Sequence, residues 1–117
     1  MNIEEFRDYC LQKAEVTESF PFDKNTLVFK VCNKMFAACD VEVFESINLK
    51  CDPERALELR AEYPGIIPGY HMNKKHWNTI MTDGSVPNDL LIDLIDHSYS
   101  LVLSKLPKKI QQQITEK

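Results

Sequence analysis

Residues 26–51 hold the feature that most constrains this fold: three short runs in which apolar and polar side chains alternate. The runs are TLVFKVC (26–32), MFAACD (35–40) and SINLKC (46–51). Successive side chains of a strand point to opposite faces, so this alternation indicates strands with one buried face. We predict an antiparallel three-stranded meander whose apolar face carries Phe29, Phe36 and Leu49. Asn33-Lys34 is the predicted two-residue turn between the first two strands, because Asn tolerates positive φ.

Helical segments flank these strands and supply the cover that their apolar face needs. Asn2 caps a first helix, Asp52-Pro53 begins a second, and Pro87 opens the longest. Pro107 ends that last helix, and KKIQQQI after it could add one or two turns. The residues predicted to face the core are Ile3, Phe6, Cys10 and Ala14 in the first helix, Leu57 and Ala61 in the second, and Leu91, Leu94, Ile95, Ser98 and Val102 in the last.

Two more β-like segments, GIIPGYHM and HWNTIMT, lie between the second and last helices. The predicted order is therefore α-β(3)-α-β(2)-α, an α+β two-layer sandwich with an antiparallel sheet. The helices cover one sheet face, and the other face stays open and carries Lys30, Asn48 and Lys50. That open face is a candidate binding surface, although outward polar residues are ordinary on any half-exposed sheet.

The totals restrict the class of protein. A chain of 117 residues with 44% hydrophobic residues has the size and composition of one globular domain, residues 1–117. Its longest apolar run, MFAAC, is far shorter than the roughly 20 residues that span a bilayer, so we expect no membrane partner. The start, MNIEEFRDYC, is acidic where a signal peptide is basic, so we expect a cytoplasmic protein. The cysteines lack the spacing of disulfide frameworks and zinc sites, which predicts free thiols: Cys10, Cys32, Cys39 and Cys51.

The segment GYHMNKKHWNTIMTDGSVP, residues 69–87, concentrates polar and aromatic chemistry. His71 and His76 are five residues apart, a spacing that fits neither a strand face nor a helix face, so a metal site with Asp83 is disfavoured. Ser85 and Thr79 lie nearby, but no base is spaced to activate them and no glycine-rich loop is present to hold phosphates. We therefore expect neither catalysis nor a cofactor.

A structural interpretation of the same segment remains open. Tyr70, Met72 and Trp77 would fill the core against the last helix, and Lys74-Lys75 would be a solvated turn. The two lysines beside histidines raise the local positive potential without any packing need, so this account explains them less well.

This segment resembles the signature of the YjbR/MmcQ-like family of small bacterial proteins, and the resemblance extends over the whole chain. The matching residues are His71, Asn73, Lys74, His76, Trp77 and Thr79, followed by Asp83 to Ser85, with further matches at Tyr9-Cys10, Phe36-Ala37, 48–54 and Leu106-Pro107. The resemblance implies the α-β(3)-α-β(2)-α fold, similar to secretion chaperones and CyaY-like proteins. It also implies a surface described as a double-wing DNA-binding motif, and it carries no enzymatic role.

Two functions follow as hypotheses. In the first, the protein binds DNA weakly and without sequence preference, with wings around Asn33-Lys34 and Lys74-Lys75. The residues assigned to phosphate are Lys30, Lys34, Lys50, Lys74 and Lys75, and those assigned to phosphate or base edges are His71, Asn73 and His76. In the second, the chain is a non-enzymatic interaction module that binds a peptide or dimerises, which its net charge of −4 favours. Neither hypothesis sets the oligomeric state.

Overall fold

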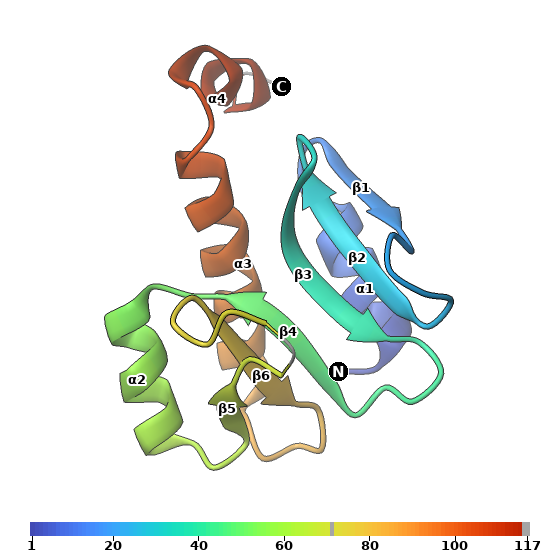
Figure 1. The fold of residues 1–117 in the computed structure, drawn as a ribbon, viewed down its shortest axis with the longest axis vertical. Coiled ribbons are helices and arrows are strands. Elements are labelled where there is room, and N and C mark those ends of the chain that lie inside the picture. Colours follow the sequence, from blue (N-terminus) through green and yellow to red (C-terminus); the bar gives the residue numbers. More distant parts are fainter. Residues whose placement is uncertain (71, 116–117) are drawn as a thin grey trace.

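The computed structural model describes residues 1–70 and 72–115, and within them the chain forms four helices and six strands (Figure 1). In chain order the elements are α1 (Ile3–Leu11), β1 (Val16–Ser19), β2 (Thr26–Val31), β3 (Lys34–Asp40), β4 (Ser46–Lys50), α2 (Pro53–Glu62), β5 (Ile66–Pro68), β6 (Trp77–Met81), α3 (Asn88–Ser104) and α4 (Lys108–Thr115). All paired strands are antiparallel, in the order β1-β2-β3-β4-β6-β5. The predicted α+β fold is confirmed; β1 is additional to the predicted order, and α4 is the short helix that KKIQQQI was expected to add.

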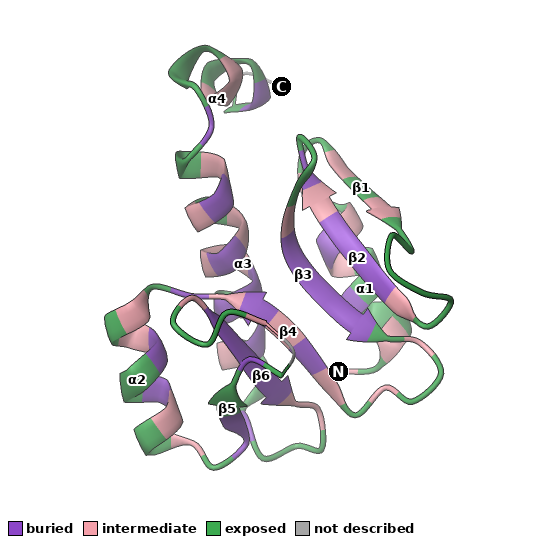
Figure 2. Cartoon of the chain, viewed as in Figure 1, coloured by how far each residue is buried: buried purple, intermediate pink, exposed green. Residues whose placement is uncertain are grey.

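Helices α1 and α3 cover one face of the sheet, and no described helix lies over the other face (Figure 1). The core between them holds Phe29, Phe36 and Leu49 together, as the alternation predicted. The five predicted positions on the inner face of α3 are all buried: Leu91, Leu94, Ile95, Ser98 and Val102. Figure 2 shows this burial concentrated in the central strands and on the inward helix faces.

A bulge in β3 shapes the middle of the sheet. Phe29 pairs with Ala37 but Lys30 pairs with Met35, so Phe36 is an extra residue without a partner in the β2–β3 register. The extra residue lets Phe36 enter the core beside Ala37, and its ring meets Tyr99 of α3 edge-on at 5.4 Å between centroids. A bulged strand also bends and twists more strongly than its neighbours.

Beyond this bulge β3 and β4 separate, and α3 bridges them. Within the described chain the two strands pair only from Ala37 to Cys39. At the next position the Ser98 hydroxyl accepts a hydrogen bond from the Lys50 amide at 2.9 Å and donates one to the Phe36 carbonyl at 2.5 Å. One buried side chain of the helical layer thus replaces the missing strand-to-strand hydrogen bond.

The predicted turn at Asn33-Lys34 is wrong by one residue. Val31 pairs with Lys34, so the two turn residues are Cys32 and Asn33, with φ of 49° and 66°. Two positive φ values suit the hairpin twist. Cysteine seldom adopts positive φ, so nothing in the local sequence indicated Cys32.

Two predicted helix faces are also wrong in part. Asp52 caps α2 and Pro53 begins it as expected, but Leu57 is 64% exposed and Ala61 is exposed, while Ala56 and Leu59 are buried. The reason is that α2 packs beside the edge strand β5 and not over the sheet face (Figure 1). Ala14 is exposed because α1 ends three residues earlier, at Leu11. Within the described residues no helix has the length and apolar character needed to cross a membrane.

Candidate functional site

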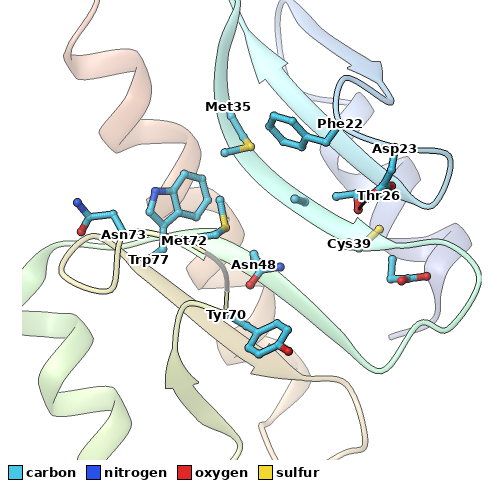
Figure 3. Close-up of a pocket in the computed structure, with 12 residues that line it drawn as sticks. Phe22, Asp23, Thr26, Met35, Cys39, Asn48, Tyr70, Met72, Asn73 and Trp77 are labelled. Carbon is cyan, nitrogen blue, oxygen red and sulfur yellow. Dashed lines mark hydrogen bonds between the residues drawn. The ribbon is translucent and has the colours of Figure 1, made fainter.

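The open face of the sheet carries a cleft of about 670 Å³. Figure 3 shows Trp77 and Met72 on one side, Met35 and Phe22 on the opposite side, and Asn48 between them. The lining residues come from the loop before β2, from β2 to β4, and from the segment that joins β5 to β6: Phe22, Asp23, Thr26, Met35, Ala38, Cys39, Asp40, Asn48, Tyr70, Met72, Asn73 and Trp77.

Strand alternation decides which side chains reach this cleft. Ile47 and Leu49 point into the core, so Asn48 and Lys50 point to the open face. Residues paired across antiparallel strands share a face, and Trp77 pairs with Lys50. Trp77 therefore lies on the open face, 8% exposed, and is absent from the core cluster beneath the helices.

This placement corrects the structural interpretation of the central segment. Trp77 and Met72 were expected to pack against the last helix, and they line the cleft on the opposite side of the sheet instead. Tyr70 was expected in the core and is 67% exposed. The error has one cause: the pairing of β6 with β4 sets which face each side chain takes, and no local pattern in 69–77 reveals that pairing.

Hydrogen bonds join the described residues of the segment between β5 and β6 to one another. The Gly69 amide donates to the Trp77 carbonyl at 2.9 Å, and a Cβ on Gly69 would lie 2.8 Å from the Cβ of Trp77. The Asn73 carbonyl accepts from the amide of Trp77 at 3.0 Å, and its side chain accepts from the amide of Lys75 at 2.9 Å. The Lys74 ammonium donates to the Gly69 carbonyl at 3.0 Å.

Arg60 of α2 fastens this segment from the helix side. Its guanidinium donates to the Lys74 carbonyl, to the Trp77 carbonyl at 3.2 Å, and to the Asn78 side-chain oxygen at 2.6 Å. Within NKKHW, the Asn73 side chain and the Lys74 ammonium therefore have a structural role.

A chain of hydrogen bonds orients Asn48 on the cleft floor. The Thr79 hydroxyl accepts from the Tyr70 amide at 2.9 Å and donates to the Asn48 Oδ1 at 2.6 Å. The Nδ2 of Asn48 therefore turns toward the cleft, as Figure 3 shows, and has no hydrogen-bond partner within the part of the chain that the structure describes. A fixed amide donor is thus available to a ligand in the cleft.

Charge is distributed unevenly along the cleft. Lys30 pairs with Met35 and Lys50 pairs with Trp77, so both lysines lie on the cleft face at the end where β3 and β4 separate. Asp23 and Asp40 line the other end, and Asp40 pairs with Thr26 there. Backbone hydrogen bonds, from Asn25 first, hold the pKa of Asp23 below its usual range, so this end carries negative charge at neutral pH. Lysines therefore lie beside one end of the cleft, and two carboxylates line the other.

The predicted site residues are distributed around this cleft. Lys30 belongs to the β2–β3 hairpin on one side, whereas Lys34 of the same hairpin pairs with the core residue Val31 and so lies on the helix-covered face. The others belong to β4 and the Gly69–Trp77 segment on the other side: Lys50, Asn73, Lys74, Lys75 and His76. Of the predicted set, Asn73 lines the cleft itself. His71 lies outside the described residues.

The prediction from sequence omitted the apolar walls. Met35 and Phe22 had no assigned role, because ESFPF interrupts a helix without starting a periodic pattern. The available signal in the sequence was the pair of phenylalanines on either side of a proline. In the structure, Phe22 of this pair is 69% exposed. A contiguous exposed apolar patch marks an interaction surface, whereas a single exposed apolar side chain is ordinary.

The described residues hold no group of three histidine, cysteine or acidic side chains arranged for a metal ion. All four cysteines are free thiols, with Cys32 exposed at the hairpin turn and the other three buried. Burial raises the pKa of Cys39 to about 12 and that of Cys51 to about 11.

Comparison with known proteins gives consistent matches. The YjbR family model matches residues 11–101. The uncharacterized protein YbdF of Escherichia coli O157:H7 is 40% identical over 106 residues, which cover 90% of this chain and 87% of YbdF. The uncharacterized protein YjbR of Escherichia coli K12 is 32% identical over 117 residues, which cover 99% of each chain.

Two solved structures have the same fold. The crystal structure of a Deinococcus radiodurans protein of the DUF419 domain family superposes with a TM-score of 0.93 at 41% identity, covering 97% of this chain and 88% of that one. A crystal structure of a Pseudomonas syringae protein superposes with a TM-score of 0.74 at 30% identity, covering 87% of this chain and 99% of that one.

Proposed function

This chain belongs to the YjbR family, and on that premise we propose that it is a non-catalytic protein that binds nucleic acid on the open face of its sheet. The observation that carries the proposal is the position of Lys30 and Lys50 on the cleft face of the sheet, where neither has an ion pair. Within the described residues the ion pairs join Arg7 to Glu18, Lys13 to Asp96 and Arg55 to Asp93, and each involves a residue of a helix or of the turn that follows α1. Of the described lysines only Lys13 has an ion pair, so Lys30, Lys50 and Lys75 beside the cleft are unpaired, as are the lysines of the C-terminal region.

Unpaired lysines suit phosphate, because neutralising a phosphate releases a condensed counterion and this release drives binding. The two wings are the β2–β3 hairpin with its turn at Cys32-Asn33 and the Gly69–Trp77 segment. Since the Lys74 ammonium already donates to a carbonyl, we assign the phosphate contact of the second wing to Lys75.

Weak, non-specific binding is the expected mode. Bidentate arginine is the usual reader of guanine. Arg7 and Arg55 form ion pairs, and Arg60 holds the backbone of the Gly69–Trp77 segment, so none of the three guanidinium groups is available for a base edge. The acidic end of the cleft further limits affinity at physiological salt.

A salt titration tests the proposal. Fluorescence anisotropy of a labelled oligonucleotide is measured between about 50 and 200 mM salt, where log affinity should fall by about 0.9 per duplex phosphate contact or about 0.7 per single-strand contact. Lys50→Ala with Lys75→Ala should reduce that slope by about 1.4–1.8. The matched control, Lys105→Ala with Lys109→Ala, removes two exposed lysines of the C-terminal region and should leave the slope unchanged. Equal slopes for the two double variants would refute the assigned surface.

A second candidate is a peptide-binding module, favoured by the sheet edge. Strand β1 is an edge strand that pairs with β2 alone in the described sheet, and two exposed aromatic residues follow it, Phe20 at 48% and Phe22 at 69%. An extended peptide adding to that edge would gain main-chain hydrogen bonds, and its side chains would meet these rings. This function predicts no affinity for nucleic acid at about 50 mM salt, the condition where non-specific binding is strongest.

A further inference from the structure

We infer that the cleft holds a single unstacked base, so that the nucleic acid bound is a single strand and not a duplex. This inference rests on the proposed function and names the form of its ligand. Three features of the cleft carry it: its walls, its floor and its charge polarity.

The walls suit a planar ring. Trp77 and Met72 face Met35 and Phe22 across the cleft (Figure 3), so a flat aromatic group entering between them meets π and sulfur surfaces on both sides. The volume of about 670 Å³ lies within the range of roughly 300–1,000 Å³ that is usual for small-molecule sites. A base within a duplex is stacked on its neighbours, so only an unpaired base enters without the cost of extrusion.

The floor offers one oriented polar group and room above it. Ala38 pairs with Asn48, so its short side chain lies beside the Asn48 amide on the open face. The Thr79 hydroxyl fixes Asn48 so that Nδ2 donates into the cleft. Every nucleobase carries ring-nitrogen or carbonyl acceptors, so this donor stabilises any base and selects weakly among them.

The charge polarity matches that of a nucleotide. Phosphates on either side of the inserted base would lie at the end with Lys30 and Lys50, where β3 and β4 separate. Asp23 and Asp40 repel phosphate from the other end and face the base, where the exocyclic amino groups of adenine, cytosine and guanine are donors. The base therefore points from the lysine end of the cleft toward its acidic end.

The fluorescence of Trp77 can report insertion of a base into the cleft. Trp77 is the only tryptophan and lines the cleft, so a base stacked against it should quench its emission. Phe22 provides the test of the opposite wall, because it is 69% exposed and its truncation leaves the core intact. Phe20 is the matched control: it is two residues away, 48% exposed and not part of the cleft lining.

The experiment compares a single strand of about 12 nucleotides, its duplex and a free nucleoside monophosphate at about 50 mM salt, by Trp77 emission and by anisotropy. We expect the single strand to quench Trp77 and to bind at least about fivefold more tightly than the duplex, the low end of base–aromatic stacking. Phe22→Ala should lose that advantage and the quenching, with duplex affinity unchanged, while Phe20→Ala behaves as wild type.

Each other outcome separates the two proposals. Binding of strand and duplex with equal affinity and no quenching would overturn base insertion and leave the lysine surface standing. No binding of either form would overturn the proposed function itself. Quenching by the free monophosphate at the same affinity as by the strand would overturn the assignment of a strand as the ligand.

Discussion

Ser98 gives the sharpest stability prediction, because one buried hydroxyl serves two strands. It is fully buried, accepts from the Lys50 amide at 2.9 Å and donates to the Phe36 carbonyl at 2.5 Å. Ser98→Ala removes both bonds and leaves a buried donor and a buried acceptor without a partner. Each such orphan costs about 1–3 kcal/mol, so we expect the free energy of unfolding to fall by about 2–6 kcal/mol.

Urea denaturation followed by far-ultraviolet circular dichroism measures this change, with Ser100→Ala as the control. Ser100 lies on the same helix with an exposed side chain, and its replacement should alter stability by no more than about 0.5 kcal/mol. Amide hydrogen exchange adds a local readout, since the Lys50 amide should lose protection before the rest of β4. If Ser98→Ala matches Ser100→Ala in both measurements, the hydroxyl does not hold the strands together.

Three further outcomes are expected. Burial, and then Arg55, lowers the pKa of His97 below 6.5, and its neutral Nε2 accepts from the Asp52 amide at 3.1 Å. The unfolded chain then binds a proton more readily than the folded one, so stability is complete above about pH 6.5 and falls below it; His97→Gln should flatten that fall in denaturation curves taken across pH. Gly69→Ala should cost about 1–3 kcal/mol in thermal or urea unfolding, because the new methyl group would lie 2.8 Å from the Trp77 Cβ. Native mass spectrometry after iodoacetamide should show one adduct, at Cys32, and three more only after unfolding, at the buried thiols Cys10, Cys39 and Cys51.

The sequence alone predicted the parts of the fold that depend on the regular spacing of apolar residues. Alternation in 26–51 placed Phe29 and Leu49 in the core, and the helical spacing from Leu91 to Val102 placed Ser98 on the inner face of α3. Both patterns predict burial correctly because the residues on one face of a strand recur every second position and those on one face of a helix every three to four positions. Neither pattern contains the β3 bulge, which arises where two strands meet.

Among the residues that the sequence prediction assigned to binding, Asn73 lines the cleft, and Lys30 and Lys50 lie beside it on the open face. The alternation of apolar and polar residues within β4 was enough to place Lys50 on the open face. The face that Trp77 occupies depends instead on the pairing of β6 with β4. That pairing joins residues some thirty positions apart, so no local window reveals it. Phe22 was missed because a non-periodic loop brings it to the cleft, and loops carry no repeating signal of burial.

The bond made by Ser98 has a consequence for ligand recognition. Its helix packs against both β3 and β4, and its hydroxyl sits where these strands part, while the cleft opens on the reverse side of the same seam. The described sheet thus consists of two parts, β1–β3 and β4–β6, that are joined only by the short pairing of β3 with β4. The angle between these two parts is set by the packing of α3 against both strands. If the proposed function holds, substitutions in α3 that never approach the ligand would alter the distance between the walls of the cleft, so the core and the binding surface would have to evolve together.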